Sequence, residues 1–164
     1  MTEAQAADLV AMLTVAGRTL GCAESLTGGL VCAALTSVPG SSAAVRGGIV
    51  AYATAVKVSL LQVSATLLAD RGAVDPDVVT QMAAGARRCL GADYGLATTG
   101  VAGPDSTDGK PVGTVYVAVA GPQASRAQAL RLQGDRTQIR EQSVLAALEL
   151  LRSTLRADLE DARW

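Results

Sequence analysis

The sequence predicts an α/β layered domain with a mixed sheet, and three observations support that prediction. Amphipathic helical patterns open and close the chain, at residues 2–16 and 135–155. Short apolar segments with strand character lie between them, as layered α/β domains require. The segments after residue 94 follow one another closely, so that part of the sheet should be antiparallel. A length of 164 residues fits one domain, 1–164.

Glycine, proline and capping residues divide the chain into its elements. Pro39-Gly40 ends the second helix. Asp75-Pro76 starts another, with Asp75 as N-cap and proline at the first helical position. Asp135 and Gln138 have the spacing of a capping box. We therefore expect helices over residues 2–16, 30–37, 54–62, 64–70, 75–89 and 135–155, and strands over 19–23, 49–52, 94–99, 112–120 and 127–132.

The composition excludes several function classes. The chain has no histidine, which excludes Ser-His-Asp and Cys-His catalytic units and histidine-based zinc sites. A net charge of −1 and few aromatic residues give no reason to expect nucleic-acid binding. The three cysteines form no C-x-x-C pair and are expected to be buried in a reducing compartment. With no signal-peptide pattern and no membrane-spanning apolar run, we expect a cytoplasmic protein without a membrane partner.

Ser25 stands where the first strand gives way to a helix, in the segment 23–29. The free N–H groups at a helix start can stabilise an oxyanion or hold a phosphate. A serine in that position is also a common helix N-cap, and the spacing alone favours that simpler role. Both interpretations remain open at this level.

Lys57 is the candidate base. Only two of the 14 basic residues are lysines, Lys57 and Lys110, and a lysine can lose its proton where an arginine cannot. A free lysine has a pKa of about 10.4, so burial would have to lower it by about 3 units for a base at neutral pH. By itself, Lys57 is better explained as a solvated lysine on a helix. Its separation of five from Tyr52, with no G-x-G-x-x-G before it, argues against a nicotinamide-dependent oxidoreductase.

A polar, glycine-rich segment spans residues 98–114. It does not form a Walker P-loop, because five residues rather than four separate Gly103 from Gly109. A ligand-binding loop and a long hairpin connection are equally good explanations of this segment.

Arg136 and Arg140 lie in the first turns of the last helix. Arginine beside a helix N-terminus suits a phosphate ligand. The helix dipole disfavours a cation there, so Arg136 needs an anionic partner. That partner is either a bound phosphate or the neighbouring Asp135.

Taken together, these segments resemble the CinA C-terminal domain family over about residues 5–155. Each motif is weak alone, but their shared order and spacing are specific. The motifs are Ala23-Glu24-Ser25-x-Thr27-Gly28-Gly29, Pro39-Gly40-Ser41-Ser42, Tyr52-x-x-x-x-Lys57, Gly72-Ala73-Val74, Thr99-Gly100-x-Ala102-Gly103-Pro104, Lys110-Pro111-Val112-Gly113-Thr114-Val115 and Gly134-Asp135-Arg136.

The resemblance implies a three-layer α/β/α fold, a homo-oligomer and a cofactor-free, metal-free amidohydrolase. That enzyme converts nicotinamide mononucleotide to nicotinic acid mononucleotide and ammonia with a serine/lysine dyad. It implies that Ser25 attacks the amide, that Lys57 takes its proton, and that Tyr52 and Ser42 relay protons or orient Lys57. Ser42 remains the alternative nucleophile, and Ser25 has the better setting at its helix start. The substrate-binding residues implied are Thr27, Gly28, Gly29, Thr99, Gly100, Gly103, Arg136 and Arg140.

Thr54 departs from the family pattern, which usually has asparagine before the lysine at this position. The loss of that carboxamide would lower or redirect activity if the asparagine orients lysine or substrate. Two other functions therefore stay open: a nucleotide-binding module without catalysis, and a purely structural subunit. Members of the family also occur fused to a larger domain, and we expect this chain to be a standalone form.

Overall fold

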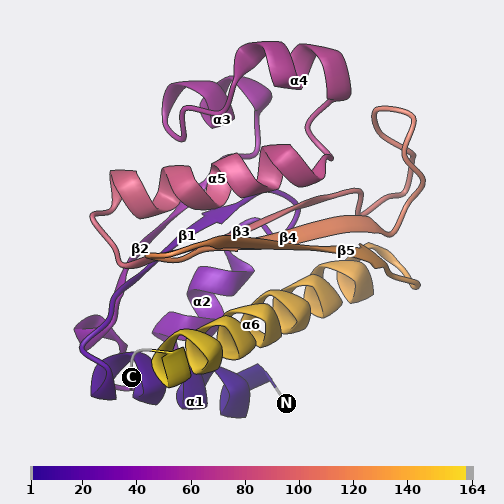
Figure 1. Cartoon of the computed structure of the whole chain (residues 1–164). Helices are drawn as coiled ribbons and strands as arrows, with labels where there is room; N and C mark the ends of the chain where they lie inside the picture. The colour runs from indigo at the N-terminus through magenta and orange to yellow at the C-terminus, as the bar shows by residue number, and fades with distance from the viewer. Residues whose placement is uncertain (1, 162–164) are drawn as a thin grey trace.

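Five strands form one mixed sheet in the computed structural model, which describes residues 2–161 (Figure 1). The strands are β1 (Leu20–Glu24), β2 (Val45–Val50), β3 (Tyr94–Gly100), β4 (Thr114–Ala120) and β5 (Ser125–Arg131). Their order across the sheet is β2-β1-β3-β4-β5. β1 is parallel to both β2 and β3, whereas β3, β4 and β5 pair antiparallel. The predicted mixed sheet, with its antiparallel part after residue 94, is confirmed.

Helices cover both faces of this sheet and give the three layers that the resemblance implied (Figure 1). One face carries α1 (Thr2–Val15), α2 (Leu30–Thr36) and α6 (Arg136–Asp161). The other carries α5 (Pro76–Cys89), with α3 (Thr54–Ser59) and α4 (Ala65–Arg71) outside it. A short 3-10 turn, η1 (Ser41–Ala43), precedes β2.

The chain changes direction across the sheet at β1. It passes through α2 to reach β2 on one side of β1, and then through α5 on the opposite face to reach β3 on the other side. The carboxyl ends of β1, β2 and β3 therefore meet at one edge, where their two connections diverge. Such switch points are where open α/β sheets bind ligands.

Each face of the sheet buries its own apolar core. The core under α1, α2 and α6 is rich in leucine and valine, whereas the core under α5 uses many alanines. Glycine lets α5 approach the sheet closely, because a Cβ on Gly95 would lie 1.9 Å from the carbonyl oxygen of Ala83. α5 therefore packs directly on the backbone of β3 at this position.

Several boundaries differ from the sequence prediction. β2 begins at Val45 rather than at residue 49, because an edge strand is half exposed and its Gly47 and Gly48 carry no apolar signal. Burial is confirmed for Cys22, but the expectation was wrong for Cys32, which is half-buried, and for Cys89, which is exposed. Within residues 2–161, no helix combines the length and apolar character needed to cross a membrane.

Candidate active site

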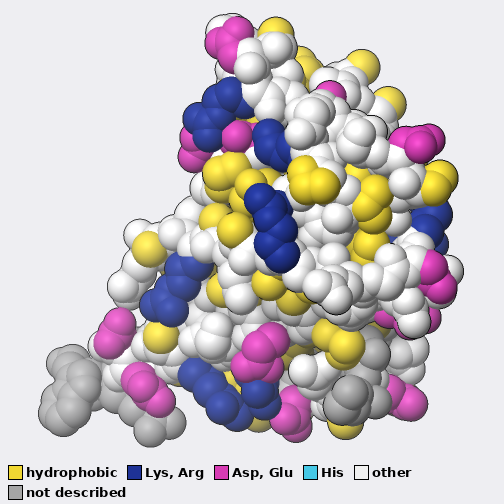
Figure 2. Space-filling view, turned by 90° about the vertical axis from the view of Figure 1, so that its right-hand side faces the viewer, with side chains coloured by type: hydrophobic (Ala, Val, Ile, Leu, Met, Phe, Trp, Pro, Cys, Tyr) yellow, Lys and Arg dark blue, Asp and Glu magenta, His cyan; other side chains and the backbone are white. Residues whose placement is uncertain are grey.

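The site lies on the edge of the sheet where the three parallel strands end. Ser25 directly follows β1, Tyr52 follows β2, and Gly103 lies in the loop after β3. The loops form the right-hand side of the molecule in Figure 1, and Figure 2 views them head-on. A basic side chain stands near the centre of that face among hydrophobic ones, with acidic side chains further out.

Ser25 is held in a tight loop rather than at a helix start. Its N–H donates to Thr98 O of β3 at 3.1 Å, and its own carbonyl accepts from Gly28 N at 3.1 Å. α2 begins only at Leu30, with Gly29 as its N-cap, so the N-cap interpretation of Ser25 was wrong. The backbone N–H and C=O of Ser25 are thus both hydrogen-bonded. Its hydroxyl takes no part in these bonds and can interact with neighbouring side chains.

The first N–H groups of α2 are already occupied. The Glu24 carboxylate accepts from Gly29 N at 2.9 Å, Val31 N at 3.0 Å and Cys32 N at 2.8 Å. Glu24 is only 1% exposed, and the positive helix end offsets its buried charge. These amides therefore serve Glu24 and not an oxyanion beside Ser25, contrary to the setting predicted for the helix start.

Two other amides near Ser25 remain open. In the described part of the chain, neither Leu26 N nor Thr27 N has a backbone acceptor. Leu26 lines the cavity beside Ser25. The amide of the residue after a nucleophile is a common oxyanion donor in serine hydrolases.

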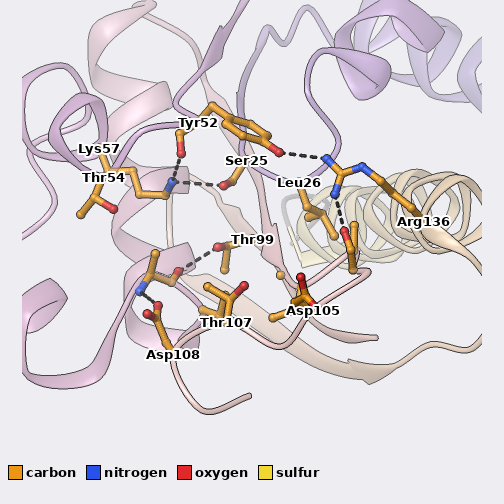
Figure 3. Close-up of a pocket in the computed structure, with 16 residues that line it drawn as sticks. Ser25, Leu26, Tyr52, Thr54, Lys57, Thr99, Asp105, Thr107, Asp108 and Arg136 are labelled. Atoms are coloured by element: carbon orange, nitrogen blue, oxygen red, sulfur yellow. Dashed lines mark hydrogen bonds between the residues drawn. The ribbon is translucent and has the colours of Figure 1, made fainter. Parts of the chain in front are cut away.

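Lys57 is buried, which the sequence alone did not favour. It comes from α3 and is 1% exposed. Its ammonium Nζ lies 3.1 Å from Ser25 Oγ and 3.4 Å from Tyr52 O (Figure 3). It also lies 2.6 Å from Ala51 O. Burial lowers the pKa of Lys57 to about 8, so a useful fraction of the amine is neutral near neutral pH.

The surroundings of Nζ orient its lone pair. A neutral amine has two N–H donors and one acceptor lone pair, and the carbonyl oxygens of Ala51 and Tyr52 can only accept. The protonated amine donates to Ser25 Oγ as well as to the two carbonyls, and once it is neutral, with its two N–H groups on the carbonyls, its lone pair faces the Ser25 hydroxyl. This arrangement is suited to removing the hydroxyl proton as oxygen attacks an electrophile.

A cavity of about 290 Å³ opens beside this pair. Many of the residues proposed from the sequence line it: Ser25, Tyr52, Lys57, Thr99, Gly100, Gly103 and Arg136. Thr54, the departure from the family pattern, lines it as well. Thr99 faces the cavity wall, with its hydroxyl donating to Ala73 O at 2.8 Å.

Arg136 bridges two of the loops at this cavity. Its Nη1 donates to Gly103 O, at 2.6 Å, and its Nη2 donates to Tyr52 Oη, at 3.0 Å (Figure 3). Neither partner is charged, and no contact with Asp135 replaces them in the described residues. The guanidinium keeps its full positive charge and further N–H donors for an anionic ligand.

Other predicted site residues are not brought to the cavity. Ser42 lies in η1, at the far end of β2 from Tyr52, and a strand of this length spans about 20 Å. The Thr27 hydroxyl is buried against Thr98 Oγ1 at 2.8 Å. Gly28 and Gly29 form the turn before α2, and Gly29 N is bound to Glu24. Arg140 donates to two loop carbonyls instead of lining the cavity.

One wall of the cavity comes from segment 98–114 and from residues 73–74, and five of its residues were not predicted individually as site residues. Ala73, Val74, Asp105, Thr107 and Asp108 line it. Segment 98–114 is both a hairpin connection and a cavity loop, turning at its tip through Asp108-Gly109 with a bridge between Thr107 and Lys110. That Asp-Gly pair is a turn signal visible in the sequence. The contact of Asp108 Oδ2 with Ala73 N, at 2.9 Å, required the fold.

No three histidine, cysteine or acidic side chains come together as a candidate metal site in residues 2–161.

Comparison with known proteins gives one consistent family. The sequence profile described as "CinA C-terminal domain" matches residues 2–155. A CinA-like protein of Frankia casuarinae is 52% identical over 147 residues, covering 90% of this chain and 34% of that protein. The chain spans about a third of the length of the curated relatives it matches.

Solved structures agree over nearly the whole fold. A competence-damaged protein (CinA) superfamily protein from Klebsiella pneumoniae superposes with a TM-score of 0.91 at 33% identity, covering 100% of this chain and 99% of that one. A competence/damage inducible protein from Agrobacterium tumefaciens gives 0.90 at 37% identity, covering 94% and 95%.

Proposed function

This chain belongs to the CinA C-terminal domain family, and from that premise we propose that it is an amidohydrolase acting on nicotinamide mononucleotide. The products would be nicotinic acid mononucleotide and ammonia. The observation that carries the proposal is the buried Lys57 amine, 3.1 Å from Ser25 Oγ, in a molecule without histidine. The names of the relatives state no amidase activity, so the reaction rests on this geometry and on the resemblance of the motifs.

In the first half-reaction, Ser25 Oγ forms a bond to the carboxamide carbon while its proton passes to Lys57 Nζ. The carbonyl oxygen becomes an oxyanion, and the amide of Leu26 is the donor we assign to it. The C–N bond then breaks as Lys57 returns its proton to the departing nitrogen. Ammonia leaves, and the nicotinoyl group remains on Ser25 as an ester.

In the second half-reaction, water attacks the ester carbon and gives its proton to Lys57. The bond to Ser25 Oγ breaks, and the serine recovers its proton from the lysine. Every proton therefore travels between Ser25, Lys57 and the substrate or water, and no further acid or base is needed. A base of pKa about 8 serves both steps, because it accepts and returns a proton at little energetic cost.

The cavity fits a mononucleotide. Its volume of about 290 Å³ lies just below the usual range of ligand sites, about 300–1,000 Å³. Arg136 lines the cavity and would supply a positive charge for the 5′-phosphate. Asp105 and Asp108 on the hairpin wall bring acceptors for ribose hydroxyl groups.

The test is ammonia release from nicotinamide mononucleotide by wild type, Ser25→Ala and Lys57→Ala. We expect turnover by wild type and a loss of at least about 1,000-fold in each variant, since the two residues act as one unit. Glu149→Ala, on the outer face of α6, is the matched surface control and should keep wild-type activity.

A nucleotide-binding module without catalysis is the alternative, and Lys57→Arg separates the two. An arginine keeps the charge but cannot accept the proton, so an enzyme loses turnover while a binding module retains ligand affinity. Nucleotide binding by a folded wild type that releases no ammonia would favour the module and point to Thr54 as the cause.

A further inference from the structure

Two arginines one turn apart on α6 serve different parts of the site. Arg136 reaches the cavity, whereas Arg140 turns toward the loop after Ser25. Arg140 Nε donates to Leu26 O at 3.0 Å, and its Nη2 donates to Thr27 O at 2.9 Å. Arg140 is half-buried and does not line the cavity, so it is placed to act on the protein rather than on a ligand.

These two bonds fix consecutive peptide planes. A trans peptide unit directs its N–H opposite to its C=O, so the carbonyls drawn to Arg140 turn the amides of Thr27 and Gly28 the other way. Gly28 N then closes the loop onto Ser25 O at 3.1 Å. The Ser25 carbonyl and the Leu26 N–H belong to the same peptide unit. By orienting Gly28 N, Arg140 therefore also helps to orient the Leu26 N–H.

The remaining restraints on the loop come from the sheet, from Glu24 and from the first residue of α2. Thr98 holds Ser25 N and the Thr27 hydroxyl, and Glu24 holds Gly29 N. The Thr27 carbonyl also accepts from Leu30 N at 3.2 Å, whereas among the described residues only Arg140 Nε donates to Leu26 O. Arg140 makes its two bonds from the helix layer, and it also brings a positive charge next to the loop where an anion would develop.

We propose that Arg140 is a positioning residue that holds the Leu26–Thr27 peptides so that Ser25 Oγ stays within reach of Lys57. The proposal rests on the proposed role of Ser25 as nucleophile, but not on the identity of the substrate. It assigns to Arg140 an effect on the reactivity of Ser25, and to Arg136 an effect on ligand affinity.

The test measures how fast a small fluorophosphonate labels Ser25. In that reaction Ser25 Oγ bonds to phosphorus, the P–F bond breaks, fluoride leaves and the serine proton passes to Lys57. We expect Arg140→Met to slow labelling by about 100-fold, as a small misplacement of reacting atoms does. Arg140→Lys keeps the charge and one donor and should recover part of that loss.

The controls separate positioning from general stability. Arg156→Met removes an exposed arginine from the same helix and should label at the wild-type rate. All variants are assayed well below their unfolding temperatures. In the hydrolysis of nicotinamide mononucleotide, Arg140→Met should have a lower kcat with little change in KM. If Arg140→Met does not fold, the test uses Arg140→Lys instead. This variant should label Ser25 more slowly than wild type does.

Labelling of a folded Arg140→Met within about twofold of wild type would overturn the inference. A wild type that is labelled at Ser25 but releases no ammonia would refute the proposed substrate alone, and the labelling ratio would still decide the role of Arg140. A wild type in which mass spectrometry finds no label on Ser25 would overturn the nucleophile and this inference together.

Discussion

Lys57 Nζ lies 3.1 Å from Ser25 Oγ although 32 residues separate them along the chain. The contact forms because β1 and β2 are parallel neighbours, so the loops after them share one edge of the sheet. Burial also changes the chemistry of this contact, because it lowers the pKa of Lys57. A pKa lowered from 10.5 to about 8 raises the neutral fraction of the amine near pH 7 by about 300-fold.

Activity should therefore depend on pH through Lys57. The base works only when neutral, so kcat/KM should fall about tenfold per pH unit below about pH 8 and level off above it. The measurement is a pH profile of ammonia release, with circular dichroism at each pH to show that the protein stays folded. A flat profile between about pH 6 and 9 would contradict the assignment of Lys57 as base.

The same burial should make the unfolding free energy rise with pH. Between the folded pKa of about 8 and the ordinary value of 10.5, the unfolded chain binds more protons than the folded one. Stability contributed by Lys57 is thus lowest below about pH 8 and recovers as the pH approaches 10.5. In urea unfolding, wild type should gain about 3 kcal/mol relative to Lys57→Met from about pH 7 to about pH 10.5.

The comparison with Lys57→Met cancels every other titrating group, including Tyr94, whose pKa burial and Asp158 raise to about 12. If the unfolding free energies of wild type and Lys57→Met changed in parallel with pH, burial would not lower the pKa of Lys57.

Arg136 should contribute affinity for the phosphate. Among the described residues, its guanidinium donates to Gly103 O and Tyr52 Oη, neither of them an acidic group, so a phosphate would be its first anionic partner there. Arg136→Ala should raise KM for the mononucleotide by about 10- to 100-fold, as the loss of hydrogen bonds to a charged group does. The riboside, which lacks the phosphate, provides the internal comparison, and equal effects on both substrates would exclude a phosphate role.

Glu24 should be required for stability through its cap on α2. In Glu24→Gln, the side-chain NH2 group replaces one carboxylate oxygen and faces a backbone N–H that needs an acceptor. We therefore expect a loss of about 2 kcal/mol in unfolding free energy. Glu149→Gln makes the same change at an exposed pair with Arg152 and should alter stability by less than about 0.5 kcal/mol. Urea titrations of both variants check this, and similar losses in the two would show that the helix cap is not special.

The candidate site could be predicted only in part, and the arginines of α6 show why. The motif around Arg136 marked both arginines for an anion, because each lies in the first turns of a helix. Helical periodicity specifies the face on which a side chain stands but not the group opposite it. The loop after β1 lies opposite Arg140, so this guanidinium is used on the carbonyls of Leu26 and Thr27.

The two candidate serines differ for a related reason. Ser25 precedes Gly28-Gly29 and Ser42 follows Pro39-Gly40, and the expected helix start favoured Ser25 without excluding Ser42. The parallel pairing of β1 with β2 places one at the carboxyl end of its strand and the other before the amino end of β2. Only the first meets Lys57.

The sequence by itself determined the elements, the mixed sheet and the range of available chemistry. Apolar spacing and caps are local signals, and a chain without histidine has few bases to offer. The tertiary structure decided which hydroxyl meets the lysine and whether that lysine is buried. Both depend on strand order and on desolvation by distant residues, and this desolvation lowers the pKa of Lys57 to about 8.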